Sequence, residues 1–446
     1  MTGSESHTAE DHARNYALLQ WTLIAVGVVF VLFSAYDRSG SDPANSRLAT
    51  IFSLTRDGSF YIDRPLDEDP NPFEQRTIDK VMVRGERIND AVHGGRLISS
   101  KPPILTLLMT GEYIVMNRLF GWDLDDPDEV ERMLMWMTIT LVGGGYLLAL
   151  VLFRKTVAFL TDDPFVCTLL LGCLAFCTQL WGYSSLLNNH VPAVGMLMIA
   201  LYVCVGIATG RLDPSPWLFV AFGFGAAMVL TIDLPVTIFP AMAGLYLAWR
   251  FPRQAIPWVI VGAFVPLAVH FGIMYGITGS LLPVQVRGEL YHFQSSFWRY
   301  PIQMDALNEP RLTYIATMTI GRKGIFLLYP VLLFGIIGAL YALARSELTY
   351  RRLVLAGLAG FLLMGLYYGT RTNNYGGECY GFRWFIGAMP VLMLMATPVM
   401  PHFKRGWRWA IVALLIGVSF YSAYESTGVG WRASQEWTCR YFGPSY

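Results

Sequence analysis

"GGRLISSKPPILTLL", from Gly94 to Leu108, sets a lysine and two prolines at the start of an apolar run that continues to residue 120. The run is nearly long enough to cross a membrane. If it crosses, Lys101 is an ordinary interfacial anchor. If it does not cross, Lys101 faces the space between an outer loop and the helix bundle. The same alternative decides the side on which every later loop lies, because each crossing reverses the side of the chain.

The composition is that of a polytopic membrane protein. Of the 446 residues, 54% are hydrophobic and 15% are charged, and the mean hydropathy is +0.43, unlike an ordinary soluble domain. The net charge of +1 gives no support for nucleic acid as a partner. Six cysteines show no metal-ligand spacing. Cys379 and Cys439 both fall on the predicted outer face, where they form a disulfide or remain thiols.

Eleven crossings are predicted from apolar runs of about 20 residues. The run 217–249 is too long for one helix and carries "TIDLPV" (231–236) at its middle, so two short helices are expected to meet there. Residues 1–16 are polar, and no small-residue cleavage site follows, which indicates a retained first helix. With 217–249 counted twice, the predicted crossings are 17–36, 133–153, 165–187, 191–209, 217–249, 256–276, 323–344, 352–369, 384–400 and 408–424.

The short basic connectors all fall on one side if the run 102–120 does not cross, and Lys and Arg mark the cytoplasmic side. The run 102–120 is therefore expected to lie along the outer face or dip into it. A second amphipathic helix is expected at 44–56, because apolar side chains recur there at helical spacing. The basic connectors contain Arg154 and Lys155, Arg211, Arg250 and Arg253, Arg345, Arg351 and Arg352, and Lys404, Arg405 and Arg408.

The expected fold class is an all-α polytopic membrane protein with about eleven transmembrane helices and additional juxtamembrane helices on the outer face. We expect residues 1–446 to form a single transmembrane domain. Within it, 37–132 is the first outer loop and 277–322 the second, and no soluble C-terminal domain is expected.

Polar residues gather at helix ends on the predicted outer face. Asn188, Asn189 and His190 form a minimal link between two predicted helices, which is either a plain polar turn or a site for a hydroxyl group or an ion. Asp233 lies at membrane depth, where an ionised carboxylate normally needs a partner. It either joins two half-helices or takes part in function.

Arg322 and Lys323 begin a predicted helix at the same face. They are either interfacial anchors or ligands for phosphate, since Arg presents a fork of donors and Lys a point charge. Cations at several outer helix ends indicate an anionic headgroup as ligand. Carboxylates and an imidazole nearby indicate acid–base chemistry on it.

The order of motifs resembles the GT-C superfamily of integral-membrane glycosyltransferases, within it the bacterial branch related to protein O-mannosyltransferases and the lipid A aminoarabinose transferase. The resemblance implies an inverting transferase that takes a sugar from a polyprenyl-phosphate carrier at the outer face of the bacterial cytoplasmic membrane. It also implies a first-loop carboxylate as general base and basic residues that stabilise charge on the lipid phosphate. The matching motifs are "NSRLATIFSLTRDGSFYID" (45–63), "DK" (79–80), "GGRLISSKPPILTLL" (94–108), "NNHVPA" (188–193), "GFGAAMVLTIDLP" (223–235), "GRKGIFLLYPVLL" (321–333) and "NYGGECYGFRWFIGAMP" (374–390).

The resemblance assigns roles to residues, with one departure. Many relatives carry an Asp-Glu pair just ahead of the Arg of the first juxtamembrane helix, where this chain has Ala44 and Asn45 in "DPANSRL". Asp42 is therefore the expected base, with Asp79, Asp63 and Asp37 in reserve. The expected ligands of donor and sugar are Lys80, Lys101, Asn188, Asn189, His190, Arg322, Lys323 and Arg383.

The implied partners are the lipid-linked donor, a lipid, glycan or protein acceptor, and membrane lipids. Relatives carry an acid where "NNH" stands, so a divalent cation stays open as a cofactor, and no other cofactor is expected.

Two alternatives belong to other functional classes. A transporter or flippase of lipid-linked precursors would use Asp233 as a proton relay, although the chain shows no repeated halves. A non-catalytic GT-C-like subunit would account for the missing Asp-Glu pair.

Overall fold

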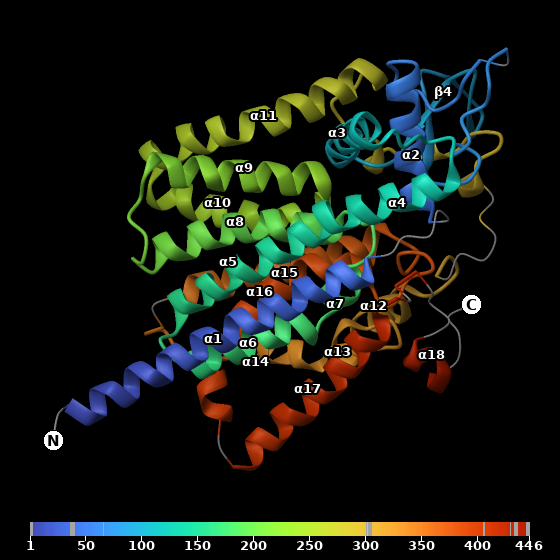
Figure 1. The fold of residues 1–446 in the computed structure, drawn as a ribbon. Coiled ribbons are helices and arrows are strands. Elements are labelled where there is room, and N and C mark those ends of the chain that lie inside the picture. The colour runs from blue at the N-terminus through green and yellow to red at the C-terminus, as the bar shows by residue number, and fades with distance from the viewer. Residues whose placement is uncertain are drawn as a thin grey trace.

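Long helices that lie side by side form most of the molecule (Figure 1). The computed structural model describes residues 3–35, 41–65, 67–299, 301, 306–348, 350–404, 406–428, 430–431 and 436–442. In this part of the chain, six helices are long and apolar enough to cross a membrane. They are α1 (Gly3–Ser34), α4 (Pro127–Met137) continued by the π-helical turn η1 (Thr138–Gly143) and α5 (Gly144–Leu160), α8 (His190–Ala208), α11 (Pro252–Thr278), α15 (Arg351–Arg371) and α17 (Trp407–Ser426).

Shorter apolar helices complete the bundle, and with them each predicted crossing corresponds to a helix of the described chain. The run 217–249 breaks at Asp233, as predicted, because Pro235 cannot continue the hydrogen-bond ladder of the preceding helix. α1 begins earlier than predicted and includes polar residues before the apolar run. The shorter helices are α6 (Pro164–Phe176), α9 (Pro216–Ile232), α10 (Ile238–Arg250) after the 3-10 turn η2 (Leu234–Thr237), α14 (Leu333–Ala344) after η6 (Pro330–Leu332), and α16 (Met389–Met395) after η7 (Arg383–Ala388).

Two helices lie across one end of the bundle instead of along it, α2 (Asp42–Arg56) and α3 (Pro103–Phe120) (Figure 1). α3 is not among the candidate membrane spans of the described chain, in agreement with the prediction for 102–120. Four short antiparallel strands that the sequence pattern did not predict join α2 to α3. They are β1 (Lys80–Val83), which pairs with β4 (Arg96–Ser99), and β2 (Glu86–Ile88), which pairs with β3 (Ala91–His93).

The basic connectors meet at the other end of the bundle. Arg211, between α8 and α9, pairs with Asp162 of the α5–α6 link at 2.7 Å. Lys404, between α16 and α17, pairs with the neighbouring Asp163, and Arg352 lies over the ring of Trp249. The basic connectors therefore share one end, as charge counting predicted; Arg405 lies outside the described residues. We refer to this end as the basic end and to the end with α2 and α3 as the polar end.

Small helices and turns cover the rest of the polar end. The 3-10 turns η3 (Val284–Val286), η4 (Gly288–Tyr291) and η5 (Phe297–Arg299) and helix α12 (Arg311–Thr319) belong to the predicted second outer loop. The remaining short elements are α7 (Gln179–Tyr183), α13 (Ile325–Leu328) and α18 (Trp437–Phe442), and η8 (Met400–Phe403), which precedes Lys404 at the basic end. Cys379 and Cys439 are both free thiols.

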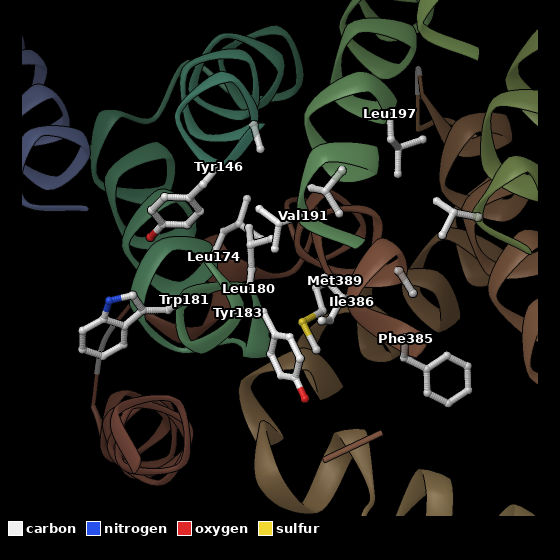
Figure 2. Packing of buried hydrophobic residues seen from close by; sticks show 14 of the residues in the cluster. Tyr146, Leu174, Leu180, Trp181, Tyr183, Val191, Leu197, Phe385, Ile386 and Met389 are labelled. Atoms are coloured by element: carbon white, nitrogen blue, oxygen red, sulfur yellow. The ribbon is translucent and has the colours of Figure 1, made fainter. Parts of the chain in front are cut away.

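Aromatic and aliphatic side chains from distant parts of the chain fill the centre of the bundle. Tyr146 of α5, Tyr183 of α7, Val191 of α8 and Met389 of α16 belong to one buried cluster in this core (Figure 2). The Tyr146 hydroxyl donates a hydrogen bond to the carbonyl oxygen of Ala175 at 2.7 Å, so the one polar atom of this ring is satisfied.

Helices α9 and α11 approach each other through glycines. A Cβ atom added at Gly262 would lie 2.0 Å from the carbonyl oxygen of Val220, and one at Gly223 would lie 2.1 Å from that of Val259. Glycine is therefore required for this close contact, as is common between membrane helices.

We expect Gly262→Ala to lower the thermal stability of the detergent-solubilised protein, because the new methyl group forces α9 and α11 apart at a cost of about 1 to 3 kcal/mol. Gly272→Ala, in the same helix but with open space around it, is the matched control and should leave the melting temperature unchanged. Equal melting temperatures for the two variants would contradict the close contact.

Candidate active site

Asp42 begins α2 at the polar end and is tied to the segment ahead of β1. Its Oδ1 accepts a hydrogen bond from the backbone N–H of Ile78 at 2.7 Å. Its carbonyl oxygen accepts one from the Thr77 hydroxyl at 2.9 Å. The carboxylate is therefore held beside residues 77–79, although they lie far along the chain from α2.

Pairing of β1 with β4 brings Asp79 and Lys101 together. In this antiparallel pair Lys80 lies opposite Ser99, so the residues just outside the pair also come close. The backbone N–H of Ser100 donates to the carbonyl oxygen of Asp79 at 3.0 Å, and the Lys101 ammonium reaches the Asp79 carboxylate at 2.7 Å. Asp42, Asp79 and Lys101 thus form a compact charged group, which we call the acid–lysine cluster.

Two arginines act on the acid–lysine cluster. Arg47 is fully buried in α2 and donates to the carbonyl oxygen of Pro43 at 2.9 Å. Arg383 begins η7, and its guanidinium lies 4.8 Å from the centre of the Trp431 ring. Both positive charges act on Lys101, and that of Arg383 acts on Asp42 as well. The sequence assigned no role to Arg47, whose signal is a cation directly before the apolar residues of an amphipathic helix.

The surroundings shift the pKa values of the cluster. Burial raises the pKa of the Asp42 carboxyl and the charge of Asp79 adds to this, while the Ile78 N–H and the cations oppose it. Burial lowers the pKa of the Lys101 ammonium, and Asp79 opposes that shift. A carboxylate with a raised pKa is a stronger base than an exposed aspartate.

His190 and Asp233 form a second polar group nearby. His190 opens α8, Asp233 follows α9, and the His190 Nδ1 lies 2.6 Å from the Asp233 Oδ2, with both side chains buried. The adjoining residues Ala193 and Ile232 pack against Ile104, which lies one turn after Lys101. η7, which starts at Arg383, also packs against α8. The pair therefore lies beside the start of α3 and the start of η7.

Of the two amides ahead of His190, one has a structural role. Asn188 donates to the carbonyl oxygens of Tyr183 and Leu186, at 2.8 and 2.7 Å, and accepts from the N–H of Val191 at 2.9 Å. Asn188 therefore closes the turn before α8. Asn189 is partly exposed at the N-cap of α8 and does not cap the helix through its side chain.

Other predicted site residues of the first loop lie in ion pairs outside the cluster. Lys80 pairs with Glu74. Asp63 pairs with Arg96 at 3.1 Å at a partly exposed position beside β4. Asp37 lies outside the described residues.

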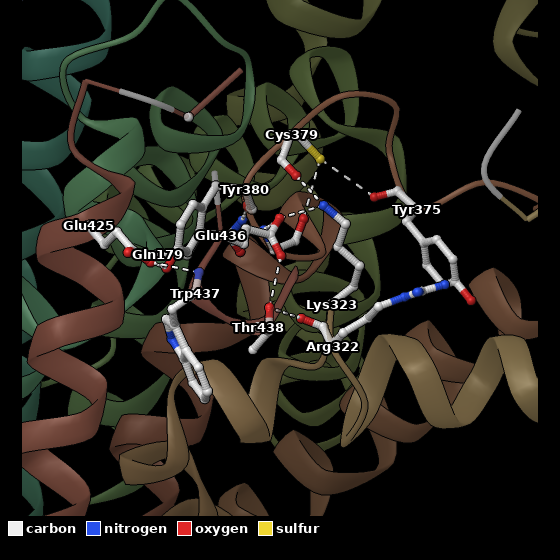
Figure 3. Close-up of polar contacts among 12 residues, drawn as sticks. Gln179, Arg322, Lys323, Tyr375, Cys379, Tyr380, Glu425, Glu436, Trp437 and Thr438 are labelled. Atoms are coloured by element: carbon white, nitrogen blue, oxygen red, sulfur yellow. Dashed lines mark hydrogen bonds and ion pairs between the residues drawn. The ribbon is translucent and has the colours of Figure 1, made fainter. Parts of the chain in front are cut away.

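Lys323 is buried in a network that holds the end of the described chain (Figure 3). Its ammonium pairs with Glu436 and donates to the carbonyl oxygen of Cys379 at 2.7 Å. Glu436 also accepts from the backbone N–H of Gly381 at 2.8 Å. Arg322 is partly buried, with an Nη2 atom 3.7 Å from Glu309. The Lys323–Glu436 pair therefore fastens α18 and the segment before Arg383 to each other.

Further contacts of the same region strengthen this fastening. The Tyr380 hydroxyl donates to the Glu425 carboxylate at 2.7 Å, and the backbone N–H of Trp437 donates to the same carboxylate at 2.9 Å. The Tyr183 hydroxyl donates to the carbonyl oxygen of Gly430 at 2.9 Å. The next residue is Trp431, whose ring contacts the Arg383 guanidinium. The sequence assigned no role to Glu436, a single acid in an aromatic stretch.

No group of three or more His, Cys, Asp or Glu side chains in the described chain has a metal-binding arrangement.

Solved structures show similarity to this chain, whereas comparisons of its sequence do not. No family model matches the sequence, and no curated protein matches it. Among solved structures, the chain is similar to the oligosaccharyltransferase of Archaeoglobus fulgidus in its apo form, with a TM-score of 0.48 and 11% identity, covering 92% of this chain and 56% of that one. The same enzyme tethered to an acceptor peptide with the NVT sequon gives 0.48 and 12%, covering 93% and 55%. This chain spans little more than half the length of those proteins, and a likeness at this level carries no conclusion about activity.

Glu436→Ala should lower the free energy of unfolding by about 3 to 5 kcal/mol, because it leaves the Lys323 ammonium buried without its partner. Thermal unfolding in detergent measures the loss. Glu347→Ala, which breaks the exposed pair with Arg345, is the matched control and should cost less than about 1 kcal/mol. Equal stability of the two variants would show that the buried pair does not hold α18.

Proposed function

We propose that this protein is an integral-membrane glycosyltransferase. It moves a sugar from a polyprenyl-phosphate-linked donor to an acceptor at the extracytoplasmic face of the bacterial cytoplasmic membrane. The observation that carries the proposal is the acid–lysine cluster with Arg383, in which a carboxylate of raised pKa lies beside two cations at the polar end of a membrane bundle. This set combines a base with cations suited to a phosphate leaving group. The resemblance of the motif order to the GT-C superfamily supports the same reading.

In the proposed reaction Asp42 is the general base. Ile78 holds its Oδ1, and Oδ2 takes the proton from the acceptor hydroxyl as the acceptor oxygen attacks C1 of the sugar. The bond between C1 and the phosphate oxygen breaks, and its electron pair stays on the lipid phosphate. Attack in line with the breaking bond inverts the configuration at C1.

Lys101 and Arg383 are the proposed ligands of the lipid phosphate. The negative charge of the leaving group grows in the transition state, so fixed cations stabilise it more than the ground state. Asp79 keeps Lys101 in place through their ion pair. It is a weaker candidate for the base than Asp42, because its carboxylate already holds a cation.

His190 is the proposed contact of the sugar or phosphate at the other side of the cluster. The Asp233 Oδ2 accepts a hydrogen bond from the His190 Nδ1–H and so orients the ring, which leaves Nε2 for the substrate. Asn189 lies next to it and is the proposed amide contact.

The remaining predicted residues have smaller roles in the proposal. Lys80, Asn188 and Lys323 are bound to protein groups outside the acid–lysine cluster, so we do not place them among the substrate ligands. Asp63, a reserve for the base, pairs with Arg96, and we do not assign it a catalytic role. Arg322 lies near Glu309 and remains a secondary phosphate ligand.

The donor is identified by profiling lipid-linked sugars and surface glycans in a deletion strain. We expect one lipid-linked sugar to accumulate and one glycan to lose the matching residue. That lipid-linked sugar is then the substrate for assays with purified protein, with polyprenyl phosphate as the released product. A deletion strain with unchanged lipid-linked sugars and unchanged glycans would contradict the proposed function.

Asp42→Asn should reduce transfer at least about a hundredfold, because the amide cannot accept the acceptor proton. Release of polyprenyl phosphate measures the rate. Asp63→Asn, which changes an acid of the same loop that pairs with Arg96, is the control and should stay near the wild-type rate.

The pH profile gives a second readout of the same change. Asp42 must be ionised to act, so the wild-type rate should fall as the pH drops through the pKa of Asp42. Since burial raises this pKa, the acidic limb should lie above the ordinary value of about 3.9. A wild-type rate that stays constant down to that value, or an active Asp42→Asn variant, would exclude Asp42 as the base.

Lys101→Gln should weaken donor binding by about tenfold or more, since a charged hydrogen bond to phosphate is lost while a hydrogen bond to Asp79 is kept. The KM for the donor measures this. Lys80→Gln, one residue from Asp79 but paired with Glu74, is the matched control. Unchanged donor KM in a stably folded Lys101→Gln protein would leave Lys101 as a structural partner of Asp79 only.

A further inference from the structure

The opposite end of the bundle contains a cleft that the proposed function does not use. It has a volume of about 460 Å³ and lies between α1, α5, α6 and α8. Its walls include the cations Arg154 and Lys155, the phenols of Tyr16 and Tyr202, and the amide of Gln20. A cleft of this size accommodates a small polar group.

Exposed tryptophans place this cleft at the depth of lipid headgroups. Tryptophan gathers where the hydrocarbon core of a membrane meets water. Trp217 begins α9, Trp249 ends α10 and Trp407 begins α17, and all three are exposed at the basic end. Trp21 of α1 is also exposed, and the Arg154 guanidinium lies 4.8 Å from the centre of its ring. Arg154 therefore lies at the interfacial level.

In the part of the chain that the structure describes, the two cations of the cleft have no ion-pair partner. One acid, Asp162, also lines the cleft, but its carboxylate pairs with Arg211 at 2.7 Å, and the neighbouring Asp163 pairs with Lys404. Arg154 and Lys155 have no carboxylate partner among the described residues. Two adjacent positive charges beside an apolar phase call for an anion.

Hydrogen bonds hold the arginine in position before any ligand arrives. Arg154 Nε donates to the Gln20 Oε1 at 2.8 Å. Gln20 Nε2 in turn donates to the Thr168 hydroxyl at 3.0 Å. These bonds join α5, α1 and α6, so the guanidinium loses little freedom when it binds a ligand.

We propose that this cleft binds the phosphate-containing headgroup of an anionic phospholipid. In this proposal Arg154 and Lys155 contact the phosphate. Tyr16 and Tyr202, which line the same cleft, contact the rest of the headgroup. The acyl chains lie along the apolar surface of α1, where Leu18 and Leu19 are exposed. The proposal is independent of the glycosyltransferase proposal, since it concerns other residues at the other end of the bundle.

Native mass spectrometry of the purified full chain tests the site, with phosphatidylglycerol and phosphatidylcholine of identical acyl chains as probes. We expect the wild type to retain phosphatidylglycerol in preference. Arg154→Gln/Lys155→Gln should weaken its binding about ten- to thirtyfold, from the contribution of two interfacial cations. Binding of phosphatidylcholine should not change.

Arg250→Gln/Arg253→Gln is the matched control, because it removes the same charge from exposed positions of the basic end outside the cleft. It should leave phosphatidylglycerol binding within about twofold of wild type. This change is small compared with the loss expected from removing Arg154 and Lys155, which contact the phosphate. Loss of Arg154 could disturb folding, so Lys155→Gln alone is a second variant, because Lys155 is exposed. It should still weaken phosphatidylglycerol binding severalfold. Equal loss in the two double variants, equal retention of both lipids by the wild type, or displacement of the lipid by inorganic phosphate would each overturn the proposal.

Discussion

The antiparallel pairing of β1 with β4 is the constraint on which the candidate site depends. It sets Lys80 opposite Ser99, and only this register places the Asp79 carboxylate within reach of Lys101. A shift by one residue would turn every side chain of a strand to the other face. The same segment anchors Asp42 through Ile78 and Thr77. A sheet of eight residues thus organises the charged end of a bundle made of helices.

The bundle separates two kinds of positive charge. At the basic end, arginines and lysines lie in short connectors beside exposed tryptophans, where they orient the protein in the membrane. At the polar end, Lys101 and Arg383 are partly buried, and Lys101 pairs with the Asp79 carboxylate. Burial raises the pKa of the Asp42 carboxyl and lowers that of the Lys101 ammonium, and charges in such surroundings act on one another more strongly than at an exposed surface.

The cationic residues of the polar end divide by their partners. Lys101 pairs with a carboxylate inside the acid–lysine cluster, whereas Lys323 pairs with Glu436 in the network around α18. Both lysines precede apolar helices in the sequence, so their local patterns are alike. Their difference comes from a residue that lies 113 positions after Lys323. A buried ion pair of this kind specifies how distant segments fit together more than it adds to stability.

The sequence by itself determined the crossing helices, the break at Asp233 and the common side of the basic connectors. These features are local, since the length of an apolar run, a proline and the charge of a connector act on their own segment. It also proposed Asp42, Lys101, His190 and Arg383 as site residues, but with them Asn188 and Lys323, which the same local patterns favoured. Only the tertiary structure decided which of these face one another, and that Asn188 and Lys323 hold the fold. Such contacts join residues far apart in the chain, and no local pattern records the register of a strand pair or the partner of a buried charge.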